Sequence, residues 1–499
     1  MIDRSAGILL PVFSLPSEYG IGTAGAAARE FVDFLAEAGQ RWWQILPLVP
    51  AGGGNSPYTS ICTHAGDSVL IDPELLHADG LVTKAELEAA KLPVTDRVNY
   101  PAVRASREVL LRRAFAVGYR KAAEAVRRFE EDNAWVRPYA LYMAIRAHFD
   151  GKPWTDWPEE ALRAYEPQTV EIWREKLADE VAYHTYVQYL FDGQWQALKE
   201  YANAKGVGII GDLPIYVSLD SSDVWSERPQ FDLDSEGRPN AVAGVPPDYF
   251  CEDGQLWGNP LYNWDVMRGD GYNWWIRRIG SAVRRFDMIR IDHFRAFESY
   301  WAVPAGAESA KEGEWCPGPG MAFLEPILGW FRGTQFIAED LGDLTPAVAQ
   351  LVRDSGLPGM RVLQFAFSDP SNTYLPHNYI ANTVCYSGTH DNNTLVGWYG
   401  EAKEEERAFV QKYLGAEGAE AVRLAVLRAG AGSVASLFVS QLQDYLALGS
   451  EARINVPGVP KGNWEWRLLP GQIPAGLAAE IRTLCATYSR CAPAAEKKK

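Results

Sequence analysis

The sequence predicts an α/β fold, a (β/α)8 TIM barrel with large, mainly helical insertions between barrel strands. Eight short apolar segments have strand character, helical patterns lie between most of them, and an acidic residue follows four of them. Eight parallel strands that alternate with helices close into a barrel, and such barrels carry their chemistry at the carboxyl ends of the strands. The eight segments lie near residues 8, 43, 208, 288, 335, 361, 384 and 437.

Length and composition are those of an ordinary globular protein. With 499 residues, the chain can remove about three-quarters of its unfolded surface from water. Hydrophobic residues make up 47% of the chain and charged residues 22%. The net charge of −16 argues against a nucleic-acid partner, whose phosphates would be repelled. No run of about eighteen apolar residues occurs, so we expect no membrane span.

The cysteines and the amino terminus indicate a cytoplasmic protein. The six cysteines form no Cys-x-x-Cys motif and no Cys/His spacing suited to a metal, so we expect reduced thiols. The first residues run into a short apolar segment that Pro11 interrupts, without the long apolar stretch of a signal peptide. The cysteines are Cys62, Cys251, Cys316, Cys385, Cys485 and Cys491.

The amino-terminal part predicts a βα unit followed by a binding loop. Residues 8–12 and 42–46 have strand character, and apolar residues recur at helical spacing between them. The next segment, 47–58, is rich in glycine but lacks the Gly-Lys-Ser/Thr ending of a phosphate-binding loop. Its backbone beside Ser56 and Tyr58 suits close approach to a polar ligand.

The domain organisation follows from the patterns that interrupt the barrel. Residues from about 72 to 203 are helical in pattern, and no Ser/Gly-rich or Pro-rich linker flanks them. We therefore expect a helical insertion within a single catalytic barrel domain, residues 1–492. The region from about 220 to 265 is a long aromatic loop of the kind that forms lids or binding loops. Residues 493–499 are expected to form a disordered tail.

The segment 286–294 combines a buried strand with ionisable side chains. Side chains alternate along a strand, so Arg290 and Asp292 point the same way. A guanidinium beside a carboxylate favours the ionised form, which a nucleophile requires. The alternative interpretation is a structural ion pair that closes the strand end.

Four acids end predicted strands: Asp212, Asp292, Glu339 and Asp391. Glu339 follows an apolar strand and adjoins Asp340, so both burial and a like charge should raise its pKa. One ionised and one protonated carboxyl group can cleave a glycosidic bond with retention when about 5–5.5 Å apart. Asp391 would then hydrogen-bond the sugar hydroxyls.

Two alternatives concern metal ions and aromatic residues. Clustered acids can hold magnesium, but Arg290 and the adjacent histidines would occupy the space of a cation, and no histidine pair has metal-ligand spacing. We expect no metal and no cofactor.

The chain has 18 Trp and 23 Tyr, many in Gly/Pro-rich segments. Flat rings there suit stacking on sugars, whereas packing in a large core is the more common role.

Three motifs, residues 290–293, 339–340 and 390–392, resemble the signature of the α-amylase superfamily. Further segments narrow the resemblance to the amylomaltase family of 4-α-glucanotransferases (glycoside hydrolase family 77), and the similarity extends from about Gly7 to Leu468. These segments are residues 44–48, 54–58, 244–250, 338–342 and 455–458.

The resemblance implies roles for individual residues. Asp292 would be the nucleophile, Glu339 the acid/base and Asp391 the transition-state stabiliser. It also implies substrates: α-1,4-glucans and maltooligosaccharides as donors, with glucose or maltooligosaccharides as acceptors. A retaining hydrolase of the α-amylase type and a non-catalytic glucan-binding protein are the alternatives. The implied substrate contacts are Ser56, Tyr58, Asp212, Asp248, Trp257, Arg290, His293, Asp340, His390 and Asn463.

Overall fold

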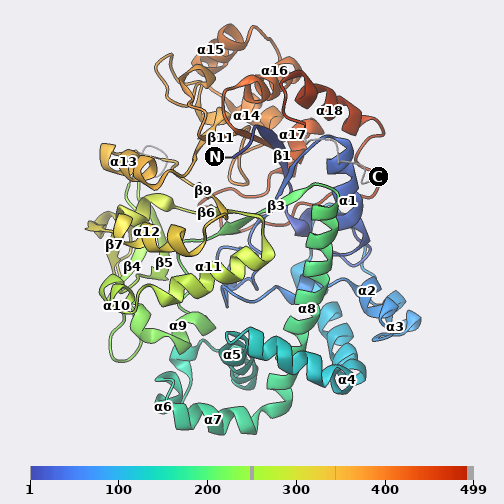
Figure 1. Ribbon diagram of the computed structural model, residues 1–499, viewed down its shortest axis with the longest axis vertical. Helices are drawn as coiled ribbons and strands as arrows, with labels where there is room; N and C mark the ends of the chain where they lie inside the picture. The colour runs from blue at the N-terminus through green and yellow to red at the C-terminus, as the bar shows by residue number, and fades with distance from the viewer. Residues whose placement is uncertain (1, 248–251, 343, 492–499) are drawn as a thin grey trace.

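The computed structural model describes residues 2–247, 252–342 and 344–491, and its centre is a closed barrel of eight parallel strands (Figure 1). Each strand pairs with its neighbours in chain order, and the last closes on the first. The predicted (β/α)8 fold is confirmed, with all eight strands near the predicted positions. They are β1 (Ser5–Leu9), β2 (Trp42–Gln44), β3 (Gly208–Leu213), β6 (Met288–Ile291), β9 (Gln335–Ala338), β10 (Gly359–Val362), β11 (Thr383–Tyr386) and β12 (Leu437–Gln441).

The barrel strands are apolar on both faces because each face is buried. In β3, Ile209 belongs to the large core shared with the helices, whereas Ile210 belongs to a separate cluster that lines the barrel interior. Ile210 pairs with Met288 of β6, which also lies in the interior cluster. Since side chains alternate along a strand, Asp212 and Arg290 continue this interior row toward the carboxyl end.

Helices surround the barrel and present apolar stripes to it. In α1 (Ala26–Glu37), the buried side chains recur three or four positions apart, which places them on one face. Strand β11 is followed by α14 (Leu395–Glu401), α15 (Glu404–Leu414) and α16 (Ala419–Gly432). The other helices of this layer are α11 (Asn273–Arg285), α12 (Met321–Trp330), α13 (Pro346–Ser355), α17 (Leu442–Tyr445) and α18 (Leu477–Thr487).

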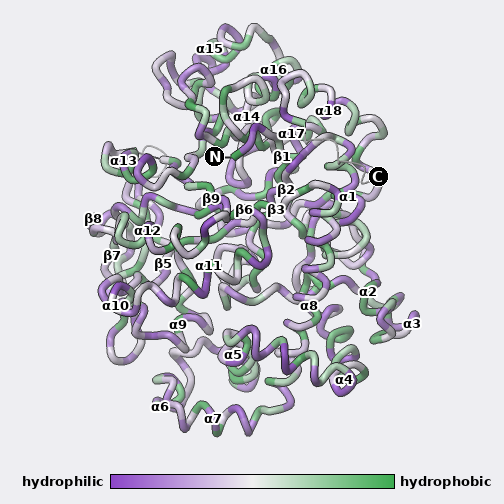
Figure 2. Tube along the Cα trace, viewed as in Figure 1, coloured by the Kyte–Doolittle hydropathy of each residue, from purple (hydrophilic) through white to green (hydrophobic). Residues whose placement is uncertain are grey.

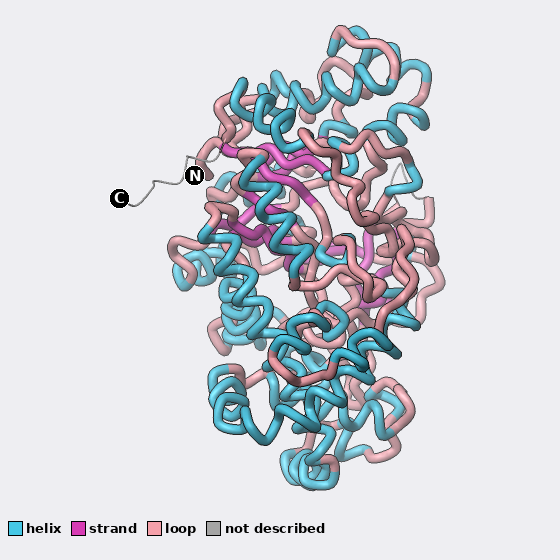
Figure 3. The backbone as a smooth tube through the Cα atoms, turned by 90° about the vertical axis from the view of Figure 1, so that its right-hand side faces the viewer, coloured by secondary structure: helices cyan, strands magenta, loops and turns pink. Residues whose placement is uncertain are grey.

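The chain between β2 and β3 forms the helical part in the lower half of Figure 1, and Figure 3 shows it below the barrel strands. Its two longest helices, α4 (Tyr100–Asp132) and α8 (Ala178–Ala204), pack together, and hydrophobic and hydrophilic segments alternate along them (Figure 2). The division into one catalytic domain with an insertion stays a prediction. The remaining helices here are α2 (Pro73–Ala78), α3 (Lys84–Ala89), α5 (Val136–His148), α6 (Glu160–Arg163) and α7 (Pro167–Lys176).

The region predicted as a lid-like loop contains regular structure instead. Beyond the short helices α9 (Ser222–Ser226) and α10 (Trp264–Gly269), a four-stranded antiparallel sheet lies beside the barrel in the order β5-β4-β7-β8. Glycine and proline within β4 and β5 weaken the strand pattern of the sequence, so the pairing of β4 with β5 and with β7 decides the structure. These strands are β4 (Ala241–Val245), β5 (Gln255–Pro260), β7 (Ser299–Pro304) and β8 (Glu314–Pro317).

Two further expectations concern cysteines and membranes. The cysteines that the structure describes are free, as expected for reduced thiols, and Cys251 lies outside the described residues. The predicted tail, residues 493–499, also lies outside them. Among the described residues, no helix combines the length and apolar character needed to cross a membrane.

Candidate active site

The carboxyl ends of β3 and β6 bring together an ionic triad of Asp212, Arg290 and Asp292, in which the first two are buried. Asp212 pairs directly with Arg290 in the sheet register, and Asp292 follows Arg290 by two positions. Arg290 Nη1 donates to both carboxylate oxygens of Asp212, each at 2.7 Å, and to Asp292 Oδ1 at 2.9 Å. The predicted proximity of Arg290 and Asp292 is therefore present.

The pKa of Asp292 depends on more than the contact with Arg290. Burial raises the pKa of the Asp292 carboxyl group, and the nearby Asp212 and Glu339 carboxylates raise it further, against the lowering effect of Arg290. Arg290 alone does not keep Asp292 ionised, because Asp212 shares the same guanidinium nitrogen. The ionisation of Asp292 therefore depends on Asp212 and Glu339 as well as on Arg290. The side chain of Asp292 remains 25% exposed, so a ligand can reach it.

Glu339 lies next to Asp292 because β9 pairs with β6. Ile291 pairs with Ala338, and each of the two acids is the next residue on its chain. Two backbone N–H groups donate to the Glu339 carboxylate, from His293 at 2.6 Å and from Leu341 at 2.8 Å. Neighbouring strands lie about 4.8 Å apart. The register therefore brings Asp292 and Glu339 to the same place at the barrel mouth.

Burial is the main cause that raises the pKa of Glu339, and the like charge of Asp340 adds to it, against the lowering effects of Arg290 and of the two backbone N–H groups. Both raising effects were expected from the sequence. Because Asp292 also has a raised pKa and lies next to Glu339, the two carboxyl groups titrate as an interacting pair. Arg290 contacts Asp292 directly, which favours the state with Asp292 ionised and the proton on Glu339.

Asp391 is the third acid of the site, and two of the residues that hold it, Arg453 and Asn455, were not among the predicted site residues. The Asn455 side-chain amide donates to Asp391 Oδ1 at 2.6 Å, and Arg453 Nη2 donates to the Asp391 backbone oxygen at 2.6 Å. His390 Nε2 lies 3.3 Å from Asp391 Oδ1. Asn455 belongs to a motif that carries the family resemblance, whereas Arg453 lies outside it.

The glycine-rich loop reaches the site through Tyr58. Its hydroxyl donates to Asp212 Oδ2 at 2.6 Å, and its ring stacks on the His390 ring with a centroid distance of 5.1 Å. Ser56 accepts a hydrogen bond from the Tyr58 backbone N–H at 3.3 Å. Tyr58 thus links the ionic triad to the segment that carries Asp391.

The antiparallel sheet contributes Trp257, whose ring meets the His293 ring edge-on at 4.8 Å. His293 adopts a left-handed backbone conformation, with φ of 48°, directly after Asp292. Burial, with the positive charge of Arg295, lowers the pKa of His293 to about 3. His293 is therefore neutral at physiological pH and suited to hydrogen bonding.

Three predicted substrate contacts are hydrogen-bonded to other groups of the protein. The Asp212 side chain is 0% exposed and fully engaged by Arg290 and Tyr58. Asp340 accepts from the Met360 backbone N–H at 2.6 Å and from Arg361. The Asn463 side chain bonds to the backbone of residues 456 and 459. These contacts hold the three side chains in place, and their roles as substrate contacts stay predictions. Asp248 lies outside the described residues.

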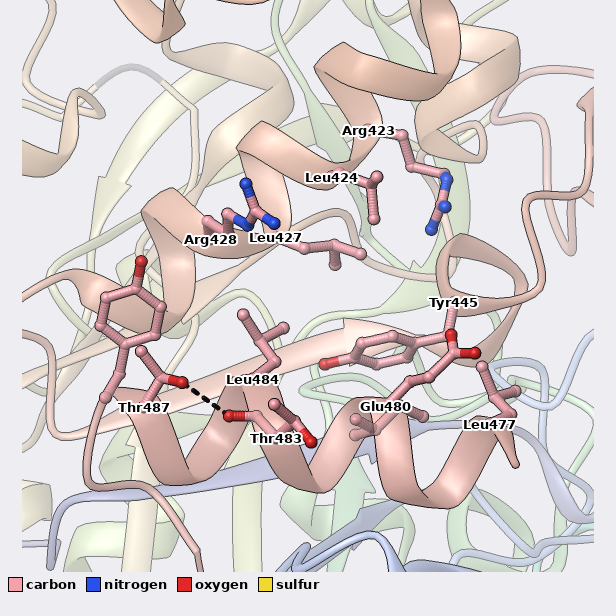
Figure 4. A pocket seen from close by; sticks show the side chains of 12 residues that line it. Arg423, Leu424, Leu427, Arg428, Tyr445, Leu477, Glu480, Thr483, Leu484 and Thr487 are labelled. Atoms are coloured by element: carbon pink, nitrogen blue, oxygen red, sulfur yellow. Dashed lines mark hydrogen bonds between the residues drawn. The ribbon is translucent and has the colours of Figure 1, made fainter.

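Other possible sites differ from this one in their chemistry. A pocket of about 450 Å³ lies between α16, α17 and α18 (Figure 4). It holds none of the predicted site residues, and one of its two arginines, Arg423, is hydrogen-bonded to Glu420.

Within residues 2–247, 252–342 and 344–491, no group of three or more His, Cys, Asp or Glu side chains is arranged to hold a metal ion. At the barrel mouth, Arg290 lies where a cation would contact Asp212 and Asp292.

The ionic triad yields a stability prediction. Asp212→Ala leaves Arg290 buried with a single carboxylate partner, so we expect the free energy of unfolding to fall by about 3 kcal/mol. Chemical denaturation measures this change. The control Tyr58→Phe removes only one hydrogen bond to Asp212 and should cost about 1 kcal/mol. Equal losses for the two variants would contradict a central role of Asp212 in holding Arg290.

A closed parallel barrel whose mouth carries two interacting carboxyl groups, a third acid and aromatic side chains is typical of enzymes that act on glycosidic bonds. The family model described as 4-alpha-glucanotransferase matches residues 10–472. This chain belongs to the 4-α-glucanotransferase family. The resemblance inferred from the motifs and the predicted enzyme class are confirmed.

Relatives and solved structures agree over nearly the whole chain. The 4-alpha-glucanotransferase of Thermus thermophilus is 47% identical over 98% of this chain and 99% of its own length. That of Synechocystis is 43% identical, with the same coverage. The amylomaltase from Streptococcus agalactiae, solved in complex with acarbose, is 37% identical, has a TM-score of 0.95, and is matched over 98% of this chain and 100% of its own.

Proposed function

We propose that this enzyme transfers segments of α-1,4-glucan to the 4-hydroxyl of an acceptor by a retaining double displacement. Donors are α-1,4-glucans and maltooligosaccharides, and acceptors are glucose or maltooligosaccharides. The observation that carries this proposal is the placement of Asp292 and Glu339 on adjacent strands, with Arg290 bonded to Asp292. Retaining enzymes hold their two carboxyl groups roughly 5–5.5 Å apart, and side chains at the ends of adjacent strands can approach each other this closely.

In the first displacement, an Asp292 oxygen forms a bond to the anomeric carbon as the glycosidic bond breaks. Glu339 gives its proton to the departing sugar oxygen. In the second displacement, ionised Glu339 takes a proton from the acceptor hydroxyl, which replaces Asp292 at the anomeric carbon. Asp391, oriented by Asn455, hydrogen-bonds the sugar ring.

The remaining site residues orient and surround the sugar. Tyr58 and His390 form a stacked pair beside Asp391, and His293 supports Trp257. Transfer requires a site that excludes water and admits a second sugar chain. We assign this task to the sheet segment that carries Trp257 and to the loop that carries Ser56 and Tyr58. The cytoplasmic location stays a prediction.

Incubation with maltotriose tests the proposed reaction against hydrolysis. Transfer yields longer and shorter oligosaccharides while the number of reducing ends stays constant, because each broken linkage is replaced by a new one. We expect this result by product chromatography and a reducing-end assay. A reducing-end count that rises in step with linkage cleavage would instead support the hydrolase alternative.

A further inference from the structure

One segment beyond the last barrel strand, residues 453–455, contacts the loop that carries Asp391 at three points. Arg453 Nη2 donates to the Asp391 backbone oxygen at 2.6 Å. The Asn455 backbone N–H donates to the His390 backbone oxygen at 3.1 Å, and the Asn455 side-chain amide donates to Asp391 Oδ1 at 2.6 Å. The position of Asp391 therefore depends on residues that lie far from it in the chain.

The side chain of Asp391 is not fixed by burial, because 44% of it is exposed. It lies in an irregular segment between the end of β11 at Tyr386 and the start of α14 at Leu395. Without a helix or strand to set the backbone, other contacts must set the direction of the side chain. Residues 453–455 supply three of these contacts.

Arg453 binds two backbone oxygens at once. Besides the contact to Asp391, its Nε donates to the Asn455 backbone oxygen at 2.7 Å, so one guanidinium joins the two segments. A charged donor forms a stronger hydrogen bond than a neutral one, and the planar guanidinium loses little freedom for each bond that it makes. Arg453 is therefore suited to fix the backbone at Asp391.

The segment 453–455 is itself anchored in the core. Ile454 is buried, and its backbone oxygen accepts a hydrogen bond from the Trp464 backbone N–H at 2.8 Å. Trp464 has a left-handed backbone conformation, with φ of 65°, and its own backbone oxygen accepts from the Tyr100 hydroxyl at 2.7 Å. Tyr100 is the first residue of α4. With this support, Arg453 is held in place independently of the loop that it contacts.

A guanidinium that joins two loops commonly serves stability alone. Here, however, one of its two acceptors is the backbone of an acid that the proposed function places against the sugar. We propose that Arg453 is a positioning residue for Asp391, which holds the Asp391 carboxylate where it hydrogen-bonds the sugar hydroxyls as the transition state forms. This inference rests on the proposed function, because the role of Asp391 comes from it. Since such hydrogen bonds strengthen in the transition state, their loss should lower the turnover number rather than raise KM.

Kinetics of Arg453 variants test the positioning role. Arg453→Met keeps the length of the side chain and removes its donors. With maltotriose, we expect the turnover number to fall about tenfold while KM stays within about twofold, because a small displacement of a catalytic group slows the reaction. Arg453→Lys keeps the charge and one donor group, so it should lose less. The control is Arg97→Met, because Arg97 Nη2 donates to the backbone oxygen of Glu451 at 2.5 Å, two residues before Arg453. Its turnover number should match wild type.

Combination with Asp391→Asn separates positioning from a purely structural role. If Arg453 acts through the Asp391 carboxylate, adding Arg453→Met to Asp391→Asn should lower the turnover number by less than about twofold. A further tenfold fall would show that the two residues act independently and would overturn the inference. A lower thermal unfolding temperature of Arg453→Met with wild-type turnover would show only a structural contact and would also overturn it.

Hydrogen exchange tests the inference without the reaction. Deuterium uptake by peptides from residues 387–394, measured by mass spectrometry, should be faster in Arg453→Met than in wild type and unchanged in Arg97→Met. This comparison holds even if wild type hydrolyses maltotriose, a result that would count against the proposed transfer alone. Unchanged uptake in Arg453→Met, or a raised KM at an unchanged turnover number, would overturn the positioning role.

Discussion

Asp292→Ala should lower the turnover number with maltotriose by about a thousandfold or more, comparable to removing the nucleophile of a catalytic triad. The proposed covalent intermediate forms on this carboxylate, and no neighbouring acid can replace it without moving. Asp212 is enclosed by Arg290 and Tyr58, and Glu339 is fixed by two backbone N–H groups. Initial rates of glucose release and oligosaccharide formation measure the effect.

The folded state should survive this change, which makes the result interpretable. Arg290 retains both contacts to Asp212 when Asp292 is shortened, so its buried charge keeps a partner. Thermal unfolding of Asp292→Ala and of the isosteric Asp292→Asn provides the control. A folded Asp292→Ala variant with turnover within tenfold of wild type would support the non-catalytic glucan-binding alternative.

Glu339→Gln should lower the turnover number with maltotriose by roughly a hundredfold to ten-thousandfold, the usual contribution of a general acid. The first displacement should persist with maltotriosyl fluoride, because fluoride leaves without a proton. Asp292→Ala should lose activity with both donors. If Glu339→Gln releases fluoride from maltotriosyl fluoride but releases glucose from maltotriose much more slowly, Glu339 acts as the acid and Asp292 as the nucleophile.

The backbone contacts of Glu339 call for a second variant. Both carboxylate oxygens accept N–H groups, and the amide of Gln can serve only one of them. Glu339→Ala, with thermal unfolding of both variants, controls for this loss. Equal rates of fluoride release by the Glu339 and Asp292 variants would contradict the assignment.

The same residue determines how activity depends on pH. The acid must be protonated for the first displacement, and burial raises the pKa of Glu339. Activity with maltotriose should therefore be retained at neutral pH and should fall as pH rises through that raised pKa. With maltotriosyl fluoride, the fluoride-release step of Glu339→Gln should lack this alkaline decline. An unchanged alkaline limb in that variant would assign the limb to another group.

The barrel and its acids were predictable because both depend on local sequence. A strand buried on both faces is apolar at successive positions, and Asp292 and Glu339 each directly follow such a strand, whereas Asp391 lies in the loop beyond β11. In the folded barrel, the register of β6 with β9 then brings Asp292 and Glu339 together. The antiparallel sheet was missed because β4 and β5 contain glycine and proline, and their strand structure depends on the pairing of β4 with β5 and with β7.

The sequence by itself determined the parallel barrel, the family and the set of acids at the strand ends, since strand periodicity and motif identity are properties of neighbouring residues. Only the tertiary structure decided how charge is distributed among those acids. Arg290 is shared between Asp212 and Asp292, Asp340 is engaged by Met360 and Arg361, and Asn455 orients Asp391. These assignments depend on which side chains meet across strands and loops that are distant in the chain. In a buried site, such contacts and the loss of water set each carboxyl pKa.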